Sequence, residues 1–251
     1  MPFAELSTGV RLHYEDVGDG PVVIPLHGWL GTARTDLGNV IDWLSADYRV
    51  LAPTLRGYGE SRPPQRDFPN DFYKRDALDV LAFMDALNVE KAHIMGYSDG
   101  GEVSLMAAGT QPERFRSVTT WGSVGYFGPA MRPIAQRSAG GEFLRKDPEL
   151  MARHGIVDAK RFVGGWIRAT VNMIDSGGDV SLSLAPQVSA PVLLMLGEND
   201  TLNPEAFGQR WVQAAPDARL VMFENTGHPI HDERWEPFTA AVGPFLAENT
   251  P

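Results

Sequence analysis

One serine lies in a sequence context that could make it a nucleophile. Ser98 is the third residue of the stretch GYSDGG, residues 96–101, which follows the apolar run 92–95 and precedes the helix-forming run 102–108. This order predicts a strand, a sharp turn and a helix. The glycines of such a Gly-x-Ser-x-Gly turn permit a close backbone approach that a Cβ atom would block, so Ser98 projects alone from the strand end. The pattern is weak alone, and its strand-to-helix context makes it specific.

A serine hydroxyl is a poor nucleophile near pH 7, so it needs a base and a carboxylate that orients the base. In an open parallel sheet, functional residues gather beyond the carboxyl ends of the strands. Asp200 follows the apolar run 191–196, and His228 follows the predicted strand 220–223. We therefore predict that Ser98, His228 and Asp200 form a catalytic triad.

Two alternatives to this triad remain open. His231 lies three residues after His228 and competes with it as the base, although it is nearer to the predicted final helix. Glu198 could replace Asp200 as the acid, although we expect it to be less exposed because it lies at the strand terminus. His27 is expected to hydrogen-bond to loop backbone rather than to take part in chemistry.

Ester cleavage also needs hydrogen-bond donors for the oxyanion that develops on the carbonyl. The backbone N–H group of Asp99 lies at the N-terminus of the helix that follows the nucleophile, and it is one predicted donor. The second is the backbone N–H group of Trp29, in the glycine-containing turn that ends the predicted strand 22–26.

The side chain of Asp99 is unusual beside a nucleophile because it faces the oxyanion. Two unit charges about 6 Å apart, at an effective dielectric constant near 20, repel by roughly 3 kcal/mol. An α-ammonium group on the acyl half of a substrate would bridge to the carboxylate and cancel this repulsion. We therefore predict that Asp99 binds substrate. The alternative is that Asp99 only complements the positive helix terminus and points to solvent.

Strands and helices alternate along the chain, which predicts an α/β fold with a mostly parallel sheet and helices on both faces. The predicted strands are 3–6 and 10–16, which form an edge hairpin, then 22–26, 49–53, 92–95, 118–121, 191–196 and 220–223. The predicted helices include 37–44, 72–87 (capped by Asn70 or Asp71), 102–108, a helix from 204 and the last one at 238–246.

The alternation breaks between residues 125 and 188, where no strand-like run occurs. Long connections in compact domains are usually functional, so we expect a helical lid over the active end of the sheet. Its amphipathic stretch 162–173 is a candidate pocket wall. The predicted organisation is a core of residues 1–124 and 189–251 with the lid inserted.

Composition limits the other classes of function. The chain has 251 residues, enough for one α/β domain, and it has no cysteine, which excludes disulfides and thiolate chemistry. Its net charge of −10 disfavours nucleic-acid binding and mildly favours a cationic partner. The sequence shows neither a signal peptide nor an apolar run long enough to span a membrane. We expect a soluble cytoplasmic protein that acts on a small-molecule ester, with no cofactor, no metal, no nucleic acid and no membrane partner.

Together the motifs His-Gly-Trp, Arg-Gly-Tyr-Gly-x-Ser, Gly-Tyr-Ser-Asp-Gly-Gly, Gly-x-x-Asp and Gly-His, in this order, resemble the α/β-hydrolase fold superfamily. Within it, residues 56–72, 98–101 and 121–122 are similar to the biphenyl-hydrolase-like, valacyclovirase-type group. That resemblance implies hydrolysis of α-amino acid esters, with Ser98, Asp200 and His228 as the triad and the Asp99 carboxylate binding the substrate ammonium.

Two other functions remain open. The first is a general carboxylesterase or perhydrolase that acts on neutral acyl groups, and the second is a ligand receptor on a hydrolase scaffold. Dehalogenase and epoxide-hydrolase chemistry of the aspartyl-nucleophile type is disfavoured. Those reactions form an alkyl ester on a carboxylate, and Ser98 occupies that position.

Overall fold

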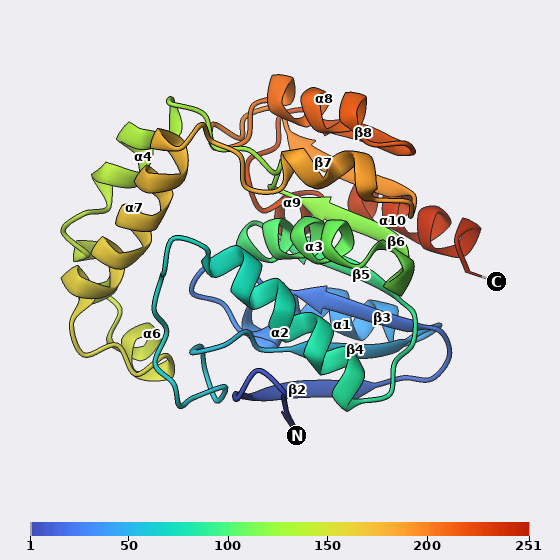
Figure 1. Cartoon of the computed structure of the whole chain (residues 1–251), viewed down its shortest axis with the longest axis horizontal. Coiled ribbons are helices and arrows are strands. Elements are labelled where there is room, and N and C mark those ends of the chain that lie inside the picture. The colour runs from blue at the N-terminus through green and yellow to red at the C-terminus, as the bar shows by residue number, and fades with distance from the viewer. Residues whose placement is uncertain (1, 251) are drawn as a thin grey trace.

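The structure is a computed structural model that describes residues 2–250. Its strands are β1 (Phe3–Glu5), β2 (Arg11–Val17), β3 (Val22–Leu26), β4 (Arg49–Pro53), β5 (Ala92–Tyr97), β6 (Phe115–Trp121), β7 (Val192–Gly197) and β8 (Ala218–Phe223). They form one eight-stranded sheet in the order β1-β2-β4-β3-β5-β6-β7-β8 (Figure 1). The pairs from β4–β3 to β7–β8 are parallel, and β2 pairs antiparallel with both β1 and β4. The predicted mostly parallel sheet and its edge hairpin are confirmed.

Helices cover both faces of this sheet. The helices are α1 (Ala33–Leu44), α2 (Phe72–Ala86), α3 (Asp99–Thr110), α8 (Glu205–Ala214), α9 (Ile230–Glu233) and α10 (Trp235–Glu248), with a short 3-10 turn η1 (Pro112–Arg114). Buried residues of α1 and α10 belong to one apolar cluster, and those of α2 and α3 belong to another. The sheet separates the two clusters, as the predicted alternation of strands and helices requires.

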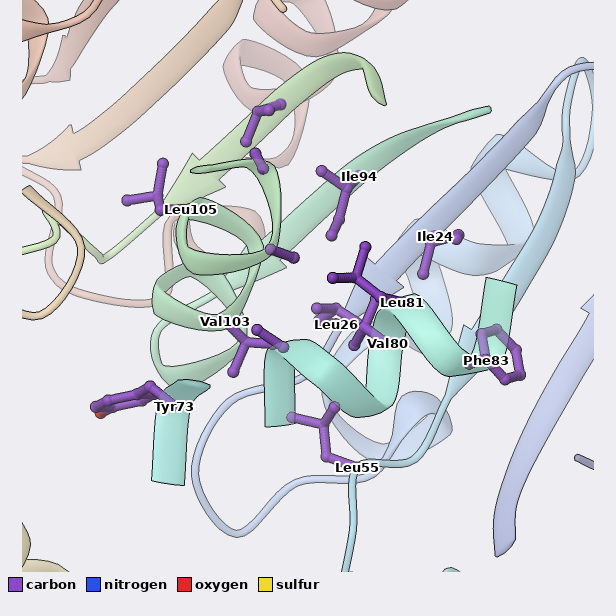
Figure 2. Packing of buried hydrophobic residues seen from close by; sticks show 14 of the residues in the cluster. Ile24, Leu26, Leu55, Tyr73, Val80, Leu81, Phe83, Ile94, Val103 and Leu105 are labelled. Atoms are coloured by element: carbon purple, nitrogen blue, oxygen red, sulfur yellow. The ribbon is translucent and has the colours of Figure 1, made fainter. Parts of the chain in front are cut away.

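The side chains of β3 contribute to both apolar clusters. Ile24 and Leu26 belong to the cluster with α2 and α3, and Val23 belongs to the cluster with α1 and α10, because successive strand residues point to opposite faces. Figure 2 shows Ile24 and Leu26 near Val80 and Leu81 of α2. Burial of each such side chain contributes about 1.5–3 kcal/mol to the stability of the folded state. The continuous apolar run at 22–26 is therefore explained by burial on both faces.

Side-chain capping explains where α1 begins, but it does not explain where α2 begins. Helix α1 begins four residues before the predicted 37–44 pattern because Thr32 and Thr35 form a reciprocal capping box: the Thr35 N–H donates to Thr32 Oγ1 at 3.1 Å, and the Thr32 N–H donates to Thr35 Oγ1 at 2.9 Å. Asp71 occupies the N-cap position of α2, as predicted, but its side chain makes no capping hydrogen bond.

Between β6 and β7 the chain is helical. This part contains α4 (Met131–Arg137), α5 (Glu142–Arg145), α6 (Pro148–Arg153), α7 (Ala159–Asp175) and the 3-10 helix η2 (Leu182–Gln187). Helices α4, α6 and α7, at the left of Figure 1, lie beyond one end of the sheet, and the arrowheads of β3 and β6 point toward them. The two ends of the segment are held together, because Gly125 O accepts the N–H groups of Val180, Ser181 and Leu182. These helices therefore stand at the carboxyl ends of the parallel strands.

No helix within residues 2–250 combines the length and the apolar character needed to cross a membrane. Across the same described residues, no group of three His, Cys, Asp or Glu side chains is placed to hold a metal ion.

Candidate active site

Ser98 stands on a strained turn between β5 and α3. Its backbone angles are φ 52° and ψ −120°, a region that residues with a Cβ atom rarely adopt. A Cβ atom on Gly96 would overlap the carbonyl of Gly100, and one on Gly100 would overlap the carbonyl of Leu26. The predicted backbone crowding is present, and it leaves the Ser98 side chain projecting from the end of the strand.

The side chains of Ser98, His228 and Asp200 lie in hydrogen-bond contact. Ser98 Oγ is 2.9 Å from His228 Nε2, and His228 Nδ1 is 2.7 Å from Asp200 Oδ2. Asp200 follows β7 and His228 follows β8, so two neighbouring strand ends deliver them beside the turn after β5. Gly122 makes room for the imidazole ring, because a Cβ atom there would lie 2.8 Å from His228 Cε1.

Asp200 is fixed by a residue that the sequence did not identify. Asn203 Nδ2 donates to Asp200 Oδ2 at 3.0 Å and to Gly122 O at 2.9 Å, and the Leu202 N–H donates to Asp200 Oδ1 at 2.9 Å. Burial opposes ionisation of the carboxyl group, but the hydrogen bonds from His228, Asn203 and Leu202 hold the pKa of Asp200 below its ordinary value. Asp200 is therefore a carboxylate at neutral pH, as a partner that stabilises imidazolium must be.

Glu198 and His231, the alternatives for the acid and the base, are engaged elsewhere. Glu198 is exposed and accepts the Asn225 N–H at 2.9 Å, so the expectation that it is less exposed than Asp200 is wrong. Strand β7 ends at Gly197, and the loop that follows it turns the Glu198 side chain to solvent. His231 is buried and uses both ring nitrogens, because Trp121 Nε1 donates to its Nδ1 at 3.0 Å and its Nε2 donates to the backbone oxygen of Asp36 at 3.0 Å.

His27 contacts backbone, as expected. Its Nδ1 donates to Gly28 O at 2.8 Å, and its Nε2 accepts the Leu55 N–H at 2.9 Å. Complete burial lowers the pKa of His27 to about 3. The ring is therefore neutral at working pH and braces the turn after β3.

The two backbone groups predicted as oxyanion donors lie beside the nucleophile. Trp29 and Asp99 line the same cavity as Ser98 and His228, and a Cβ atom on Gly28 would lie 3.2 Å from Ser98 Cβ. Among residues 2–250, neither the Trp29 N–H nor the Asp99 N–H donates a hydrogen bond to a protein acceptor. Both groups are therefore available to a negatively charged oxygen.

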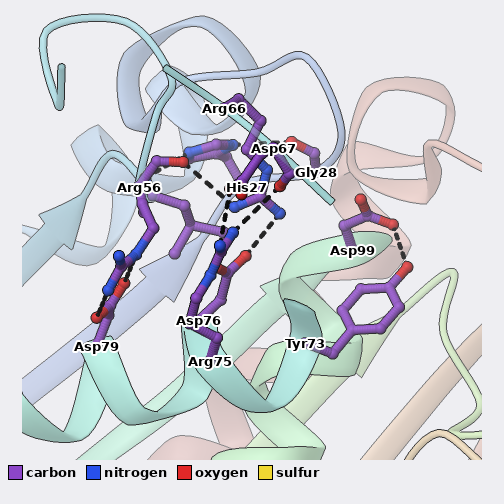
Figure 3. A network of polar contacts seen from close by, with 11 residues as sticks. His27, Gly28, Arg56, Arg66, Asp67, Tyr73, Arg75, Asp76, Asp79 and Asp99 are labelled. Atoms are coloured by element: carbon purple, nitrogen blue, oxygen red, sulfur yellow. Dashed lines mark hydrogen bonds and ion pairs between the residues drawn. The ribbon is translucent and has the colours of Figure 1, made fainter. Parts of the chain in front are cut away.

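The Asp99 carboxyl group is buried, so the solvent-facing alternative is wrong. Oδ1 accepts the Tyr73 hydroxyl at 2.6 Å, a contact visible in Figure 3, whereas Oδ2 has no hydrogen-bond partner among the described residues. Burial raises the pKa of Asp99 to about 6, against the lowering effects of the Tyr73 hydrogen bond and the Arg66 charge. Arg66 forms its ion pair with Asp76, at 2.7 Å, and not with Asp99. Among the described residues, the Asp99 carboxyl group therefore has no ion-pair partner.

These groups open into a cavity of about 270 Å³ between the sheet and the helices of the 125–188 segment. Its apolar wall includes Trp29, Phe127, Met131, Ile134, Ala135, Trp166 and Leu202, and its polar groups include Asp99, Glu102 and Asn203. None of the described residues that line it is Lys or Arg. A larger cavity of about 430 Å³, between residues 65–68 and α7, contains no member of the Ser98 cluster, so we place the candidate site in the smaller one.

The chain is similar to known proteins in both sequence and structure. Residues 21–153 match the family described as alpha/beta hydrolase fold. Human serine hydrolase BPHL is 33% identical over 95% of this chain and 84% of its own length, and the 2-hydroxy-6-oxo-6-phenylhexa-2,4-dienoate hydrolase of Burkholderia cepacia is 28% identical over 94% and 91%. The solved structure of the enzyme with the same activity from Rhodococcus sp. strain RHA1 superposes with a TM-score of 0.78, at 25% identity over 99% of this chain and 98% of that one.

Proposed function

Because this chain belongs to the α/β-hydrolase fold family, we propose that it is a serine hydrolase that cleaves carboxylic esters through an acyl-enzyme on Ser98. The observation that carries the proposal is the unbroken contact from Ser98 Oγ through the His228 ring to Asp200, at 2.9 and 2.7 Å. The two unoccupied N–H groups beside Ser98 add the electrostatic part that acyl transfer requires.

In this mechanism His228 Nε2 takes the proton of Ser98 Oγ as the oxygen attacks the ester carbonyl. Asp200 stabilises the resulting imidazolium, and the N–H groups of Trp29 and Asp99 donate to the oxyanion. His228 then returns the proton to the leaving alcohol as the carbon–oxygen bond breaks. His228 Nε2 then takes a proton from a water molecule as the water attacks the acyl-enzyme carbonyl. It returns that proton to Ser98 Oγ as the carbon–oxygen bond breaks, which releases the carboxylic acid and the free Ser98 hydroxyl.

The preferred substrate is an α-amino acid ester. An α-ammonium group is one carbon from the carbonyl that Ser98 attacks. Asp99 lines the same cavity as Ser98, and its Oδ2 is a buried oxygen without a hydrogen-bond partner in the described chain. Burying a charge without a partner is costly, so a cation that reaches this oxygen gains both attraction and relief of that cost. An ammonium ion also lowers the pKa of the carboxyl group and keeps it charged.

Residues 125–188 act as the lid in this proposal, and residues 1–124 with 189–251 form the catalytic core. Phe127, Met131 and Trp166 give the cavity beside Ser98 an apolar wall, which suits the side chain of the substrate's acyl half or its leaving group.

The apolar wall favours one alternative, a general carboxylesterase or perhydrolase that acts on neutral acyl groups. A dienoate substrate, such as the names of two relatives state for those proteins, fits less well. Its carboxylate would meet Asp99 and Glu102, with no Lys or Arg among the described lining residues. A receptor without turnover is disfavoured because the Ser98, His228 and Asp200 contacts are intact.

A substrate panel tests the proposal. Purified protein is assayed with L-phenylalanine ethyl ester, with ethyl 3-phenylpropionate as its desamino analogue, and with p-nitrophenyl butyrate. We expect all three to be cleaved, with kcat/KM for the amino ester about tenfold or more above that of its analogue. Ser98→Ala and His228→Ala should each abolish turnover with the fold retained, because such residues act as a unit. Equal rates on the first two esters would leave a general esterase, and no turnover at all would leave a receptor.

A further inference from the structure

The side chain of Asp36, on α1, reaches under the turn that follows β3. The Gly28 N–H donates to Asp36 Oδ2 at 3.0 Å. A Cβ atom on Gly31 would overlap the same carboxyl group, so the turn closes around Asp36 only because Gly31 has no side chain. The carboxylate thus contacts residues on both sides of Trp29, the residue whose N–H group faces the oxyanion in the proposed mechanism.

The backbone of Asp36 ties this turn to the nucleophile and to the loop of the base. The Asp36 carbonyl accepts His231 Nε2–H at 3.0 Å, and His231 Nδ1 accepts Trp121 Nε1–H at 3.0 Å. The carbonyl of Trp121 accepts the N–H of Ser98 at 2.9 Å. Four segments that are distant in sequence therefore meet in one chain of hydrogen bonds that ends at Gly28 on one side and Ser98 on the other.

A second contact fixes the far end of the turn. His154, which follows α6, donates from Nε2 to the carbonyl of Leu30 at 2.8 Å, and its Nδ1 accepts the Gly59 N–H at 3.1 Å. Leu30 has a φ of 64°, so the turn is strained at this residue and needs such support. Trp29 lies between the two supports, Asp36 at Gly28 and His154 at Leu30.

We propose that Asp36 is a positioning residue of the reaction: its carboxylate holds the Gly28 amide so that the next amide, that of Trp29, stays aimed at the oxyanion. The proposal rests on the proposed function, because it assigns Asp36 a part only if Trp29 is an oxyanion donor. A displacement of about 1 Å in such a group costs a factor near 10² in rate, so a support under the turn matters to kcat.

The charges around Asp36 make this support dependent on pH. Burial raises the pKa of Asp36 to about 7, the Gly28 hydrogen bond and Arg153 of α6 lower it, and Asp232 of α9 raises it. Tyr97 of β5 also interacts with Asp36, and burial raises the pKa of its phenol, so Tyr97 stays neutral in this pH range. Burial lowers the pKa of His154 to about 4, and burial also lowers the pKa of His231, so both imidazoles are neutral where Asp36 titrates. A neutral carboxyl group is a weaker acceptor than a carboxylate. The hold on Gly28 is therefore strong above pH 7 and weakens as the pH falls through 7.

Three variants separate positioning from structure. Asp36→Ala removes the acceptor. Asp36→Asn keeps an oxygen that can accept the Gly28 N–H and removes the titration. Asp42→Asn is the matched control, because Asp42 is on the same helix, is exposed and pairs with Arg34. Each variant is assayed on p-nitrophenyl butyrate from pH 5.5 to 9, with Tm measured alongside. The Gly28 amide signal is followed by ¹H–¹⁵N NMR over the same range.

We expect Asp36→Ala to lower kcat by about 10- to 100-fold with KM within about twofold, less than the 10²- to 10³-fold loss seen when an oxyanion donor itself is removed. Asp36→Asn should keep kcat within about threefold at pH 8 and fall less steeply than wild type below pH 7, and Asp42→Asn should match wild type. In wild type the Gly28 amide should titrate near pH 7, and in Asp36→Asn it should not.

Several results would overturn the inference: kcat unchanged in Asp36→Ala, equal losses in the Ala and Asn variants, or a Gly28 amide that does not titrate in wild type. The amide titration is read without turnover. A wild-type protein that cleaves no ester would therefore refute the serine hydrolase, while the NMR result still decides whether Asp36 controls the turn.

Discussion

The Tyr73 hydroxyl lies 2.6 Å from Asp99 Oδ1, and Asp99 Oδ2 is buried without a hydrogen-bond partner in the described chain. Both side chains are buried, and they come from two helices, α2 and α3, that pack side by side on one face of the sheet. Tyr73 thus fixes the carboxylate by one oxygen, and in the proposed function the other oxygen would bind the substrate ammonium group.

Replacing Tyr73 with Phe tests this relationship. The hydrogen bond from Tyr73 lowers the Asp99 pKa, which burial raises to about 6, so its loss should raise that pKa further. A larger fraction of Asp99 would then be protonated at pH 6 to 7, where the substrate ammonium is still charged, and KM for L-phenylalanine ethyl ester should rise there relative to wild type at the same pH. The desamino ester is the control, and its KM should not change. A rise that is equal for both esters at every pH would mean that Tyr73 only packs.

A second prediction concerns the ion pair beneath the site. Arg66 and Asp76 lie 2.7 Å apart, their side chains are 2% and 1% exposed, and Figure 3 shows the pair beside the Arg56–Asp79 pair. Removing one partner of a buried pair leaves an uncompensated charge and costs about 3–5 kcal/mol. Arg66→Met should therefore lower the free energy of unfolding in urea titrations by an amount near the lower end of that range, because Arg75 Nε remains 3.7 Å from Asp76 Oδ1. The matched control is Arg145→Met, which removes an exposed pair with Glu142 and should cost less than about 1 kcal/mol.

The acid of the triad is tested by Asp200→Asn. By analogy with the serine protease triad, loss of the carboxylate that orients the imidazole should lower kcat by about 10⁴. Glu198→Gln is the control and should keep its activity, because Glu198 is exposed and bonds only to loop backbone among the described contacts. If the Glu198 variant lost activity and the Asp200 variant kept it, the assignment of the acid would be wrong.

The positions of the strands along the chain and the site motifs could be predicted because local signals determine them. Apolar runs such as 22–26 and 191–196 are buried strands, and the polar residues just after them, Asp200 among them, meet at one end of the sheet by topology alone. The turn at Gly96 and Gly100 could be predicted because a residue with a Cβ atom does not fit at either position.

The parts that the sequence did not predict are contacts between segments. Tyr73 contacts Asp99, and Asn203 contacts Gly122, only in the folded chain. The residues next to Tyr73 and Asn203 in the sequence form no motif that would indicate these contacts. The exposure of Glu198 depends on the direction of a loop rather than on its distance from the strand. The capping box at the start of α1 has Thr35 in the position that Glu or Gln usually occupies, so the sequence lacks the usual signal for a helix that begins at Ala33.

The helices of residues 125–188 should control which leaving groups are accepted. Trp166 of α7 lines the cavity and stacks on Trp29 with ring centroids 4.6 Å apart. Trp166→Ala should change the ratio of kcat/KM between ethyl and benzyl esters of phenylalanine more than it changes the rate on p-nitrophenyl acetate. Ile167→Ala is the matched control, because Ile167 is on the same helix and does not line the cavity. A uniform loss on all three esters would make this segment a stability element.

The most direct measurement is a cycle between Asp99→Asn and a pair of substrates, L-phenylalanine ethyl ester and ethyl 3-phenylpropionate. Asparagine keeps the size of the side chain and the backbone N–H, so the oxyanion donor should survive while the charge disappears. If the carboxylate binds the α-ammonium, kcat/KM for the amino ester should fall by about 2 kcal/mol or more, roughly 30-fold. The desamino ester should be cleaved as well as before or better, because the charge beside the oxyanion is gone. Equal losses on both esters would contradict the account and leave Asp99 a support for the turn in a general esterase.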